Sequence, residues 1–429
     1  MFAFHETTRK RVCRTAFFAL CVAPTLASAA WIGSHHAPGR TGRLARELSD
    51  KLGVHVKLAD WREPRPRIAS SSGIMLSDAA SGSPLADVAS FELRRDGEGH
   101  GYSAAEVAID GHELARLGKS VRSWLAKLPA ERTEIHCRRL IIRLANVSAA
   151  PKGPSGPFNT LVFHEIEGIA DRDASGRQYA EFTARAVDGD QSPDKVVRLT
   201  LAAATTSNSA APTLTLDTHG CSVPARLLSG IVPGFDRLGE HARFIGEVRW
   251  SLDAVLIQGV AQGRVDSVEL SAVLPAGSPH AIEGLANLEL SELSWRGLRI
   301  ERLAGTVVAG PATMSRSLVE AAVRNFSCGQ SDAGVPAASD HALVALDALA
   351  VQFELDAKGL TFWGHSPPGL NLPQGCLAMS GAKPILFGPP YRDWPLGELV
   401  RTLAAPSTAW LPATREAVEM ADRLPLPPK

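Results

Sequence analysis

The sequence lacks the compact motifs of common catalytic and metal centres. It has 13 histidines, yet it contains neither H-E-x-x-H nor H-x-H, and His164-Glu165 and His35-His36 have no third ligand at a suitable spacing. No G-x-S-x-G nucleophile elbow occurs. The glycines of Gly97 to Gly101 are not followed by the Lys-Ser or Lys-Thr of a phosphate-binding loop. These absences predict a protein that is not an enzyme, with no catalytic residues, no cofactor and no metal.

The sequence also lacks a charge imbalance. Its 45 basic and 45 acidic side chains give a formal net charge of zero. No overall field therefore draws the protein onto a polyanion, so we expect no nucleic-acid partner. With 45% hydrophobic and 21% charged residues, the chain is typical of a folded protein.

Long apolar runs are absent except near the N-terminus. There, a basic cluster from Arg9 to Arg14 precedes the apolar run Thr15 to Ala23 and the small residues that end at Ala30. This order is typical of an export signal, which would be cleaved near Ala29. If the run instead continues through Gly33, it comes close to the 20 or so residues that a membrane-spanning helix needs. Both alternatives, a signal peptide and an uncleaved inner-membrane anchor, place the rest of the chain on the exported side.

Cysteine is scarce, and its spacing carries no motif. Four cysteines lie beyond the export segment: Cys137, Cys221, Cys328 and Cys376. An oxidising compartment would permit disulfides between them, but the sequence cannot rank the three pairings. Buried single thiols are the other interpretation.

Glycine and proline are plentiful, with 37 and 29 residues, which favours many turns between short strands. The clearest example is the stretch from Gly246 to Gly310, where Gly263, Gly284 and Gly305 are equally spaced. Alternating apolar and polar residues lie between the glycines and predict strands over 248–252, 265–270 and 286–291. Each such strand has one apolar face, which must be covered by protein or by a lipid chain.

Other segments predict a mixture of strands and short helices. Helical spacing predicts helices over 39–52, 112–128, 314–326, 396–403 and 413–424, and a short one over 224–228. Alternation predicts strands over 54–58, 135–147, 160–169, 196–202, 213–216 and 349–356. We divide the chain into 1–33 (signal peptide or anchor), 34–110 (helix plus strands), 111–240 (β-rich, with helix 112–128), 241–383 (glycine-spaced strands) and 384–429 (Pro-rich tail with short helices).

Two regions of the chain have an order of motifs that points to a known family. In the first region, an export segment and short helix precede Leu52 to Val56, the turn Pro64-Arg65-Pro66, Ile74 to Asp78 and Gly82 to Ala86. The second region contains Gly284 to Leu290, Trp295 to Leu298, Leu303 to Gly305 and Ser315 to Leu318. The first region resembles the start of the AsmA/TamB-like proteins of the bacterial envelope, in particular those of planctomycete-like bacteria, and the second is similar to their β-rich bodies. The resemblance implies a mainly β fold: an elongated, curved antiparallel sheet with an apolar groove, a few short helices and an N-terminal export segment.

The resemblance also implies a location on the periplasmic side of the cell envelope and a part in lipid traffic or outer-membrane assembly. We therefore expect a non-enzymatic protein that binds lipid along an apolar groove or scaffolds assembly, with phospholipid and envelope proteins as candidate partners. The residues predicted to line the groove are Val248, Trp250, Leu252, Ala286, Leu288, Leu290, Leu349, Val351, Phe353 and Leu355. The alternative is an exported multi-domain structural or adhesion protein whose apolar faces close on one another as β-sandwiches. An exported hydrolase, the third class, would need Ser, His and a carboxylate gathered from distant segments.

Overall fold

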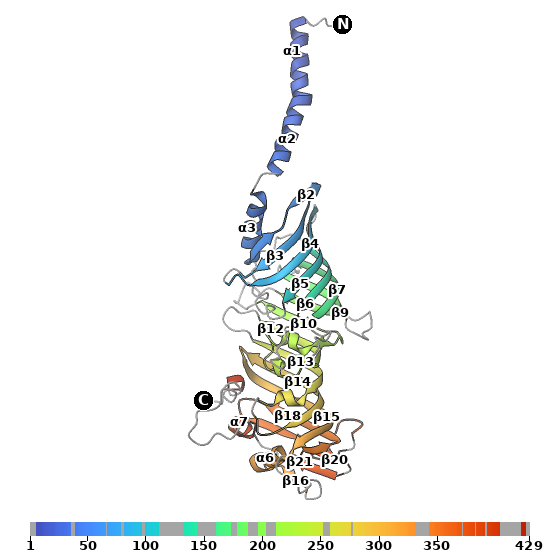
Figure 1. Ribbon diagram of the computed structural model, residues 1–429, viewed down its shortest axis with the longest axis vertical. Coiled ribbons are helices and arrows are strands. Elements are labelled where there is room, and N and C mark those ends of the chain that lie inside the picture. The colour runs from blue at the N-terminus through green and yellow to red at the C-terminus, as the bar shows by residue number, and fades with distance from the viewer. Residues whose placement is uncertain are drawn as a thin grey trace.

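The computed structural model has a long apolar helix at its N-terminus, which projects away from the body of the protein (Figure 1). The helix consists of α1 (Glu6–Phe17), the π-helical stretch η1 (Phe18–Val22) and α2 (Ala23–His35). Its stretch Lys10–Ala29 is long and apolar enough to cross a membrane, and none of it is covered by the rest of the chain. An N-terminal apolar helix of this kind fits a signal peptide or a membrane anchor.

The structure describes residues 6–35, 39–65, 67–78, 81–96, 99–110, 132–143, 160–172, 178–187, 196–202, 212–251, 258–275, 278–331, 343–370, 372–381, 383–390, 393–403 and 422–425. The predicted helix 112–128 and most of the predicted helix 413–424 lie outside these residues.

The first part of the body is the helix α3 (Arg40–Leu52), packed on the start of the sheet. Leu44, Leu48 and Leu52 share one face of α3 and pack against a small core that includes Val56 and Ile74. The helix ends at Gly53, whose φ of 69° is the left-handed conformation that glycine adopts at helix ends. The predicted helix 39–52 is confirmed.

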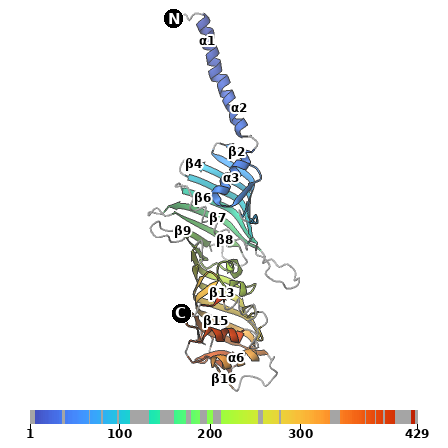
Figure 2. The same cartoon turned by 90° about the vertical axis from the view of Figure 1, so that its left-hand side faces the viewer.

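The strands of the first half follow one another along the long axis and form a curved sheet (Figures 1 and 2). Their bounds are β1 (His55–Leu58), β2 (Arg62–Arg65), β3 (Ile68–Ser77), β4 (Pro84–Asp96), β5 (Gly99–Asp110), β6 (Arg132–Arg143), β7 (Thr160–Arg172), β8 (Gln178–Val187) and β9 (Val196–Ala202). Neighbours in sequence pair antiparallel from β3 to β9, except that β5 and β6 are parallel. A parallel pair needs a long connection, and β5 and β6 are separated by 21 residues in the sequence.

The second half continues the same sheet. Its strands are β10 (Thr213–Asp217), β11 (Val223–Pro224), β12 (Arg243–Ser251), β13 (Gln258–Glu269), β14 (Ile282–Arg296), β15 (Arg299–Ser315), β16 (Gly329–Gln330), β17 (Leu343–Leu346), β18 (Ala348–Leu355), β19 (Leu360–Gly364), β20 (Cys376–Ser380) and β21 (Lys383–Phe387). Short helices lie between them: η4 (Ala225–Leu228), η5 (Phe235–Arg237), α5 (Leu270–Val273), α6 (Arg316–Phe326) and α7 (Leu396–Leu403). β9 pairs with β10, and β10 with β12, so the hydrogen-bonded ladder crosses from one half to the other without a break.

The predicted fold class is confirmed, since the protein is mainly β with a few short helices and an N-terminal apolar helix. The sheet is mixed rather than wholly antiparallel because β5 and β6 pair in parallel. The predicted helices at 224–228, 314–326 and 396–403 correspond to η4, α6 and α7.

The glycine-spaced block forms β12 to β15, whose strands are longer than the alternating runs indicated. Gly263 and Gly305 flank Leu290 from either side, as its partners in β13 and β15. Gly263 has a φ of 141°, and a side chain there would collide with the backbone of Ile245 and Gly246 in β12. Close approach of the two strands therefore requires glycine at this position.

In β3 to β7, the alternation of buried and exposed residues is interrupted along one line, which we call the crease. Each strand there places two consecutive residues on the exposed side: Ser72-Gly73, Ala89-Ser90, Ala105-Glu106, Arg138-Arg139 and His164-Glu165. Ser90 and Glu165 have φ values of 51° and 50°, a left-handed conformation that is uncommon for residues other than glycine. A left-handed residue inside a strand bends the strand and changes the direction of the side chains next to it, as in a β-bulge.

Candidate functional site

The residues predicted to line an apolar groove are mostly buried inside the second half of the protein. Val248, Trp250, Ala286, Leu290, Leu349 and Leu355 are buried, whereas Leu288, Val351 and Phe353 are half-buried. Leu252 lies outside the described residues. Five of the buried side chains, those other than Leu355, belong to the largest hydrophobic cluster of the protein. In this structure they form part of its core, and their role as a groove lining stays a prediction.

The structure reveals a much longer apolar row, of which Val248 and Leu355 are members. Cross-strand neighbours on the inner face of the sheet form an unbroken series from β3 to β19: Ala69, Leu93, Tyr102, Ile135, Gly168, Phe182, Leu199, Leu216, Val248, Ala261, Leu293, Leu303, Leu355 and Leu360. We call this series the inner row.

The neighbours of the inner row on the opposite face are polar. From β3 to β13 they are Ser70, Glu92, Ser103, His136, Glu167, Thr183, Arg198, Asp217, Glu247 and Gln262. The sheet therefore has one apolar and one hydrophilic face, as an antiparallel sheet with one solvated face does.

Burial along the inner row divides it into two parts. Val248, Ala261 and Leu293 in the second half are 0%, 0% and 2% exposed. Between β5 and β10, in contrast, Tyr102, Ile135, Phe182, Leu199 and Leu216 are only half-buried. The first half therefore has apolar surface that its own core covers incompletely.

The second half is closed by the segment between β10 and β12, which folds over the apolar face. Its residues Val223, Leu228, Val232 and Phe235 are buried in the main cluster. The ring of Phe235 lies 5.7 Å from that of Phe244 in β12, measured between centroids. This segment fills the space that a ligand would need on this part of the sheet.

Helix α6 extends this closed core. The ring of Phe326, at the end of α6, meets Phe362 at a centroid distance of 5.3 Å and Trp394 at 5.6 Å, both edge to face. Edge-to-face contacts are a favourable geometry for aromatic pairs. The far end of the protein from the N-terminal helix is therefore a packed cap, in which α6 lies beside β16 and β21 (Figure 1).

One serine–histidine pair is formed by segments that are distant in the sequence. Nδ1 of His280 lies 2.9 Å from Oγ of Ser317, which in turn lies 3.0 Å from Oγ of Ser315. Burial lowers the pKa of His280, and a hydrogen bond with the backbone of Thr402 partly offsets that effect. Ser315 also accepts a hydrogen bond from the amide of Ala281. The network ties the start of β14 to the first turn of α6 and to the end of α7, which is a structural role.

The described part of the chain contains no group of three or more His, Cys, Asp or Glu placed to hold a metal ion. All six cysteines are free thiols, four of them buried. Burial raises the pKa of Cys328 to about 12, so this thiol stays protonated.

No protein-family model matches the chain, and no curated protein has a matching sequence.

Proposed function

We propose that this protein is an exported, non-enzymatic envelope protein of the AsmA/TamB-like type, which binds lipid along the inner row between β5 and β10. The observation that carries the proposal is the half-buried, apolar part of this row, formed by side chains from successive strands. It agrees with an N-terminal apolar helix that fits an export signal or an anchor.

The energetics of such a site favour an acyl chain. Each methylene group removed from water contributes about 0.8 kcal/mol. A chain lying across the strands would pass Tyr102, Ile135, Gly168, Phe182, Leu199 and Leu216 in order, each from the next strand. Adjacent strands are about 4.8 Å apart, so the five steps between these six positions extend over roughly 24 Å, which is comparable to the length of an extended acyl chain.

A structural role in the envelope is the second candidate, and the closed core of the second half favours it. Most of the predicted groove residues there are covered by the protein's own side chains. In the proposed function this half serves as a rigid cap, and the lipid is confined to the first half.

The test compares two variants at neighbouring positions on opposite faces. Leu199→Asn places an amide in the inner row, and Thr200→Asn places the same amide on the polar face, where Thr200 pairs with Glu181 and Thr215. Full-length protein is purified from membranes in mild detergent and analysed by native mass spectrometry. We expect phospholipid on the wild type and on Thr200→Asn, and at least a tenfold lower lipid occupancy on Leu199→Asn.

Thermal unfolding provides the second readout. A ligand that binds only the folded state raises the unfolding midpoint with its concentration, so added phospholipid should stabilise the wild type and Thr200→Asn but not Leu199→Asn. Wild-type protein that carries no lipid and gains no stability from phospholipid would refute lipid binding and leave the structural role.

A further inference from the structure

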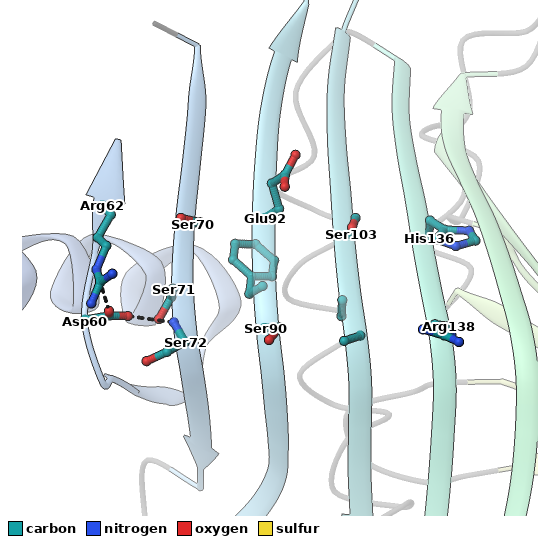
Figure 3. A pocket seen from close by; sticks show the side chains of 13 residues that line it. Asp60, Arg62, Ser70, Ser71, Ser72, Ser90, Glu92, Ser103, His136 and Arg138 are labelled. Carbon is teal, nitrogen blue, oxygen red and sulfur yellow. Dashed lines mark hydrogen bonds and ion pairs between the residues drawn. The ribbon is translucent and has the colours of Figure 1, made fainter. Parts of the chain in front are cut away.

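A hollow of about 520 Å³ lies on the polar face of β3 to β6, along the crease (Figure 3). Its volume lies in the range of small-molecule sites. Its lining residues Ser70, Glu92, Ser103 and His136 are the neighbours of the inner row on the opposite face of the sheet, and in Figure 3 a helix passes behind the sheet. The hollow is therefore on the face opposite to α3 and to the inner row.

The hollow exists because its central strand has small side chains. β5 contributes Ser103, Ala104 and Ala105, whereas β6 beside it carries His136 and Arg138. Ser103 is the cross-strand partner of both His136 and Glu92. The larger side chains of β4 and β6 thus form the sides of the hollow, and the small side chains of β5 form its bottom.

The acidic side chains of the hollow already have cationic partners. Asp60 is paired with Arg62 at 3.0 Å, and Glu92 with Arg94 at 2.7 Å. The amide of Ser72 donates a hydrogen bond of 2.6 Å to Asp60. This hydrogen bond, the largest cause, holds the pKa of Asp60 below its usual value. Both carboxylates are therefore compensated.

The remaining polar groups of the hollow are mostly donors without a partner. Within the described part of the chain, Arg138 and His136 form no side-chain hydrogen bond or ion pair, and neither do the hydroxyl groups of Ser70, Ser90 and Ser103. Arg139, the next residue, differs in this respect because it pairs with Glu106 at 3.2 Å. Arg138 is therefore the one lining arginine whose charge is not compensated by the described residues.

We propose that this hollow binds a phosphate group, with the guanidinium of Arg138 as its charge partner and the ring of His136 and the hydroxyls of Ser90 and Ser103 as hydrogen-bond donors. Arginine matches the geometry of phosphate oxygens, which it binds through two parallel hydrogen bonds. Ala105 lines the hollow together with Ser90 and Arg138, and its small methyl group leaves room for the anion. The site lies on the other face of the sheet from the lipid-binding row, so it does not depend on the proposed function.

The phosphate can belong to a soluble compound or to a phospholipid head group. The head group is a candidate because β2 and β3 are near the end of the body from which the N-terminal helix extends (Figure 1). Both sources present the same chemistry to Arg138. The experiment therefore includes glycerol 3-phosphate, inorganic phosphate and vesicles of phosphatidylglycerol mixed with phosphatidylcholine.

Binding of the two soluble phosphates is measured by isothermal titration of full-length protein in uncharged detergent at low ionic strength, and binding to vesicles is measured by co-sedimentation after the detergent has been removed. The comparison is between Arg138→Gln and Arg139→Gln, which remove the same charge from adjacent positions of β6. A single exposed charge-assisted site predicts a Kd on the order of 1 mM for phosphate. We expect Arg138→Gln to weaken binding about tenfold and Arg139→Gln to change it less than twofold. Arg138→Lys should retain part of the affinity, because it keeps the charge and loses the two-bond geometry.

Equal effects of the two glutamine variants would show non-specific attraction and overturn the proposal, as would the absence of phosphate binding by the wild type. Circular dichroism confirms that each variant is folded, and Ser103→Ala gives an independent measure if Arg138→Gln is not. Vesicle binding that depends on Arg138 identifies a head group as the source. Binding of the soluble phosphates alone identifies a soluble compound.

Discussion

The phenyl ring of Phe182 in β8 lies over Gly168, its cross-strand partner in β7. A methyl group added to Gly168 would be only 2.6 Å from Cδ1 of Phe182 and 3.2 Å from Cβ of Ile135. An aromatic ring that covers a cross-strand glycine fixes the register of a sheet. All three residues belong to the inner row, so this contact sets its shape where the row is half-buried.

Replacement of Gly168 by alanine should therefore destabilise the protein. The methyl group would push the ring of Phe182 from its position, and overpacking of this kind costs about 1 to 3 kcal/mol. Urea denaturation followed by circular dichroism measures the change in the free energy of unfolding. Gly101→Ala is the control, because a methyl group there would meet only Cβ of Arg94 at 3.7 Å, an ordinary contact. Equal stability of the two variants would contradict the packing of Phe182 on Gly168.

Leu290 and Leu298 allow the core of the second half to be tested within one hairpin. Leu290 in β14 is 3% exposed, and Leu298, at the turn between β14 and β15, is 76% exposed. Leu290→Ala should lower the free energy of unfolding by about 2 to 5 kcal/mol, because it removes buried methyl groups and leaves a cavity. Leu298→Ala should change it by less than about 0.5 kcal/mol. A small effect at Leu290 would mean that its side chain lines an open surface rather than the core.

His280 predicts a pH dependence of stability. Burial lowers its pKa below the ordinary 6.5. The unfolded chain therefore binds a proton at a higher pH than the folded one, so the stabilising contribution is complete above about pH 6.5 and is lost as the pH falls through the lowered value. Between pH 7.5 and 5, the wild type should lose more stability than His280→Gln. Parallel curves for the two proteins would exclude His280 as the cause.

The sequence was most informative where the apolar pattern is regular. Helix α3 was predicted within a residue of its bounds because three leucines recur every fourth position and a glycine follows them. Strand β18, with apolar residues at Leu349, Val351, Phe353 and Leu355, was predicted for the equivalent reason. In both elements, local pattern and tertiary packing agree.

Strand β5 was missed because its pattern is broken by the crease. Its sequence from Gly99 to Asp110 has small and polar residues, and the pair Ala105-Glu106 interrupts the alternation. In the folded protein, pairing on both sides with β4 and β6 supplies the stability that the local sequence does not.

The sequence contains one indication of the phosphate site. Arg138 and Arg139 are consecutive charged residues inside an otherwise alternating strand, Arg132–Arg143. Such a break marks two residues on the same face of a bent strand. The sequence could not show that Arg139 has an acidic partner whereas Arg138 has none among the described residues, because Glu106 belongs to another strand, far from Arg139 in the sequence.

The buried thiol of Cys328 should be unreactive in the folded protein. Burial raises its pKa to about 12, so the reactive thiolate is nearly absent at pH 8. At pH 8, iodoacetamide should label Cys328 within minutes after addition of denaturant and leave it unmodified over the same time in the folded protein, as measured by peptide mass spectrometry. Labelling of Cys328 in the folded protein at the rate seen in denaturant would mean that the cap formed by α6 and its aromatic partners opens in solution.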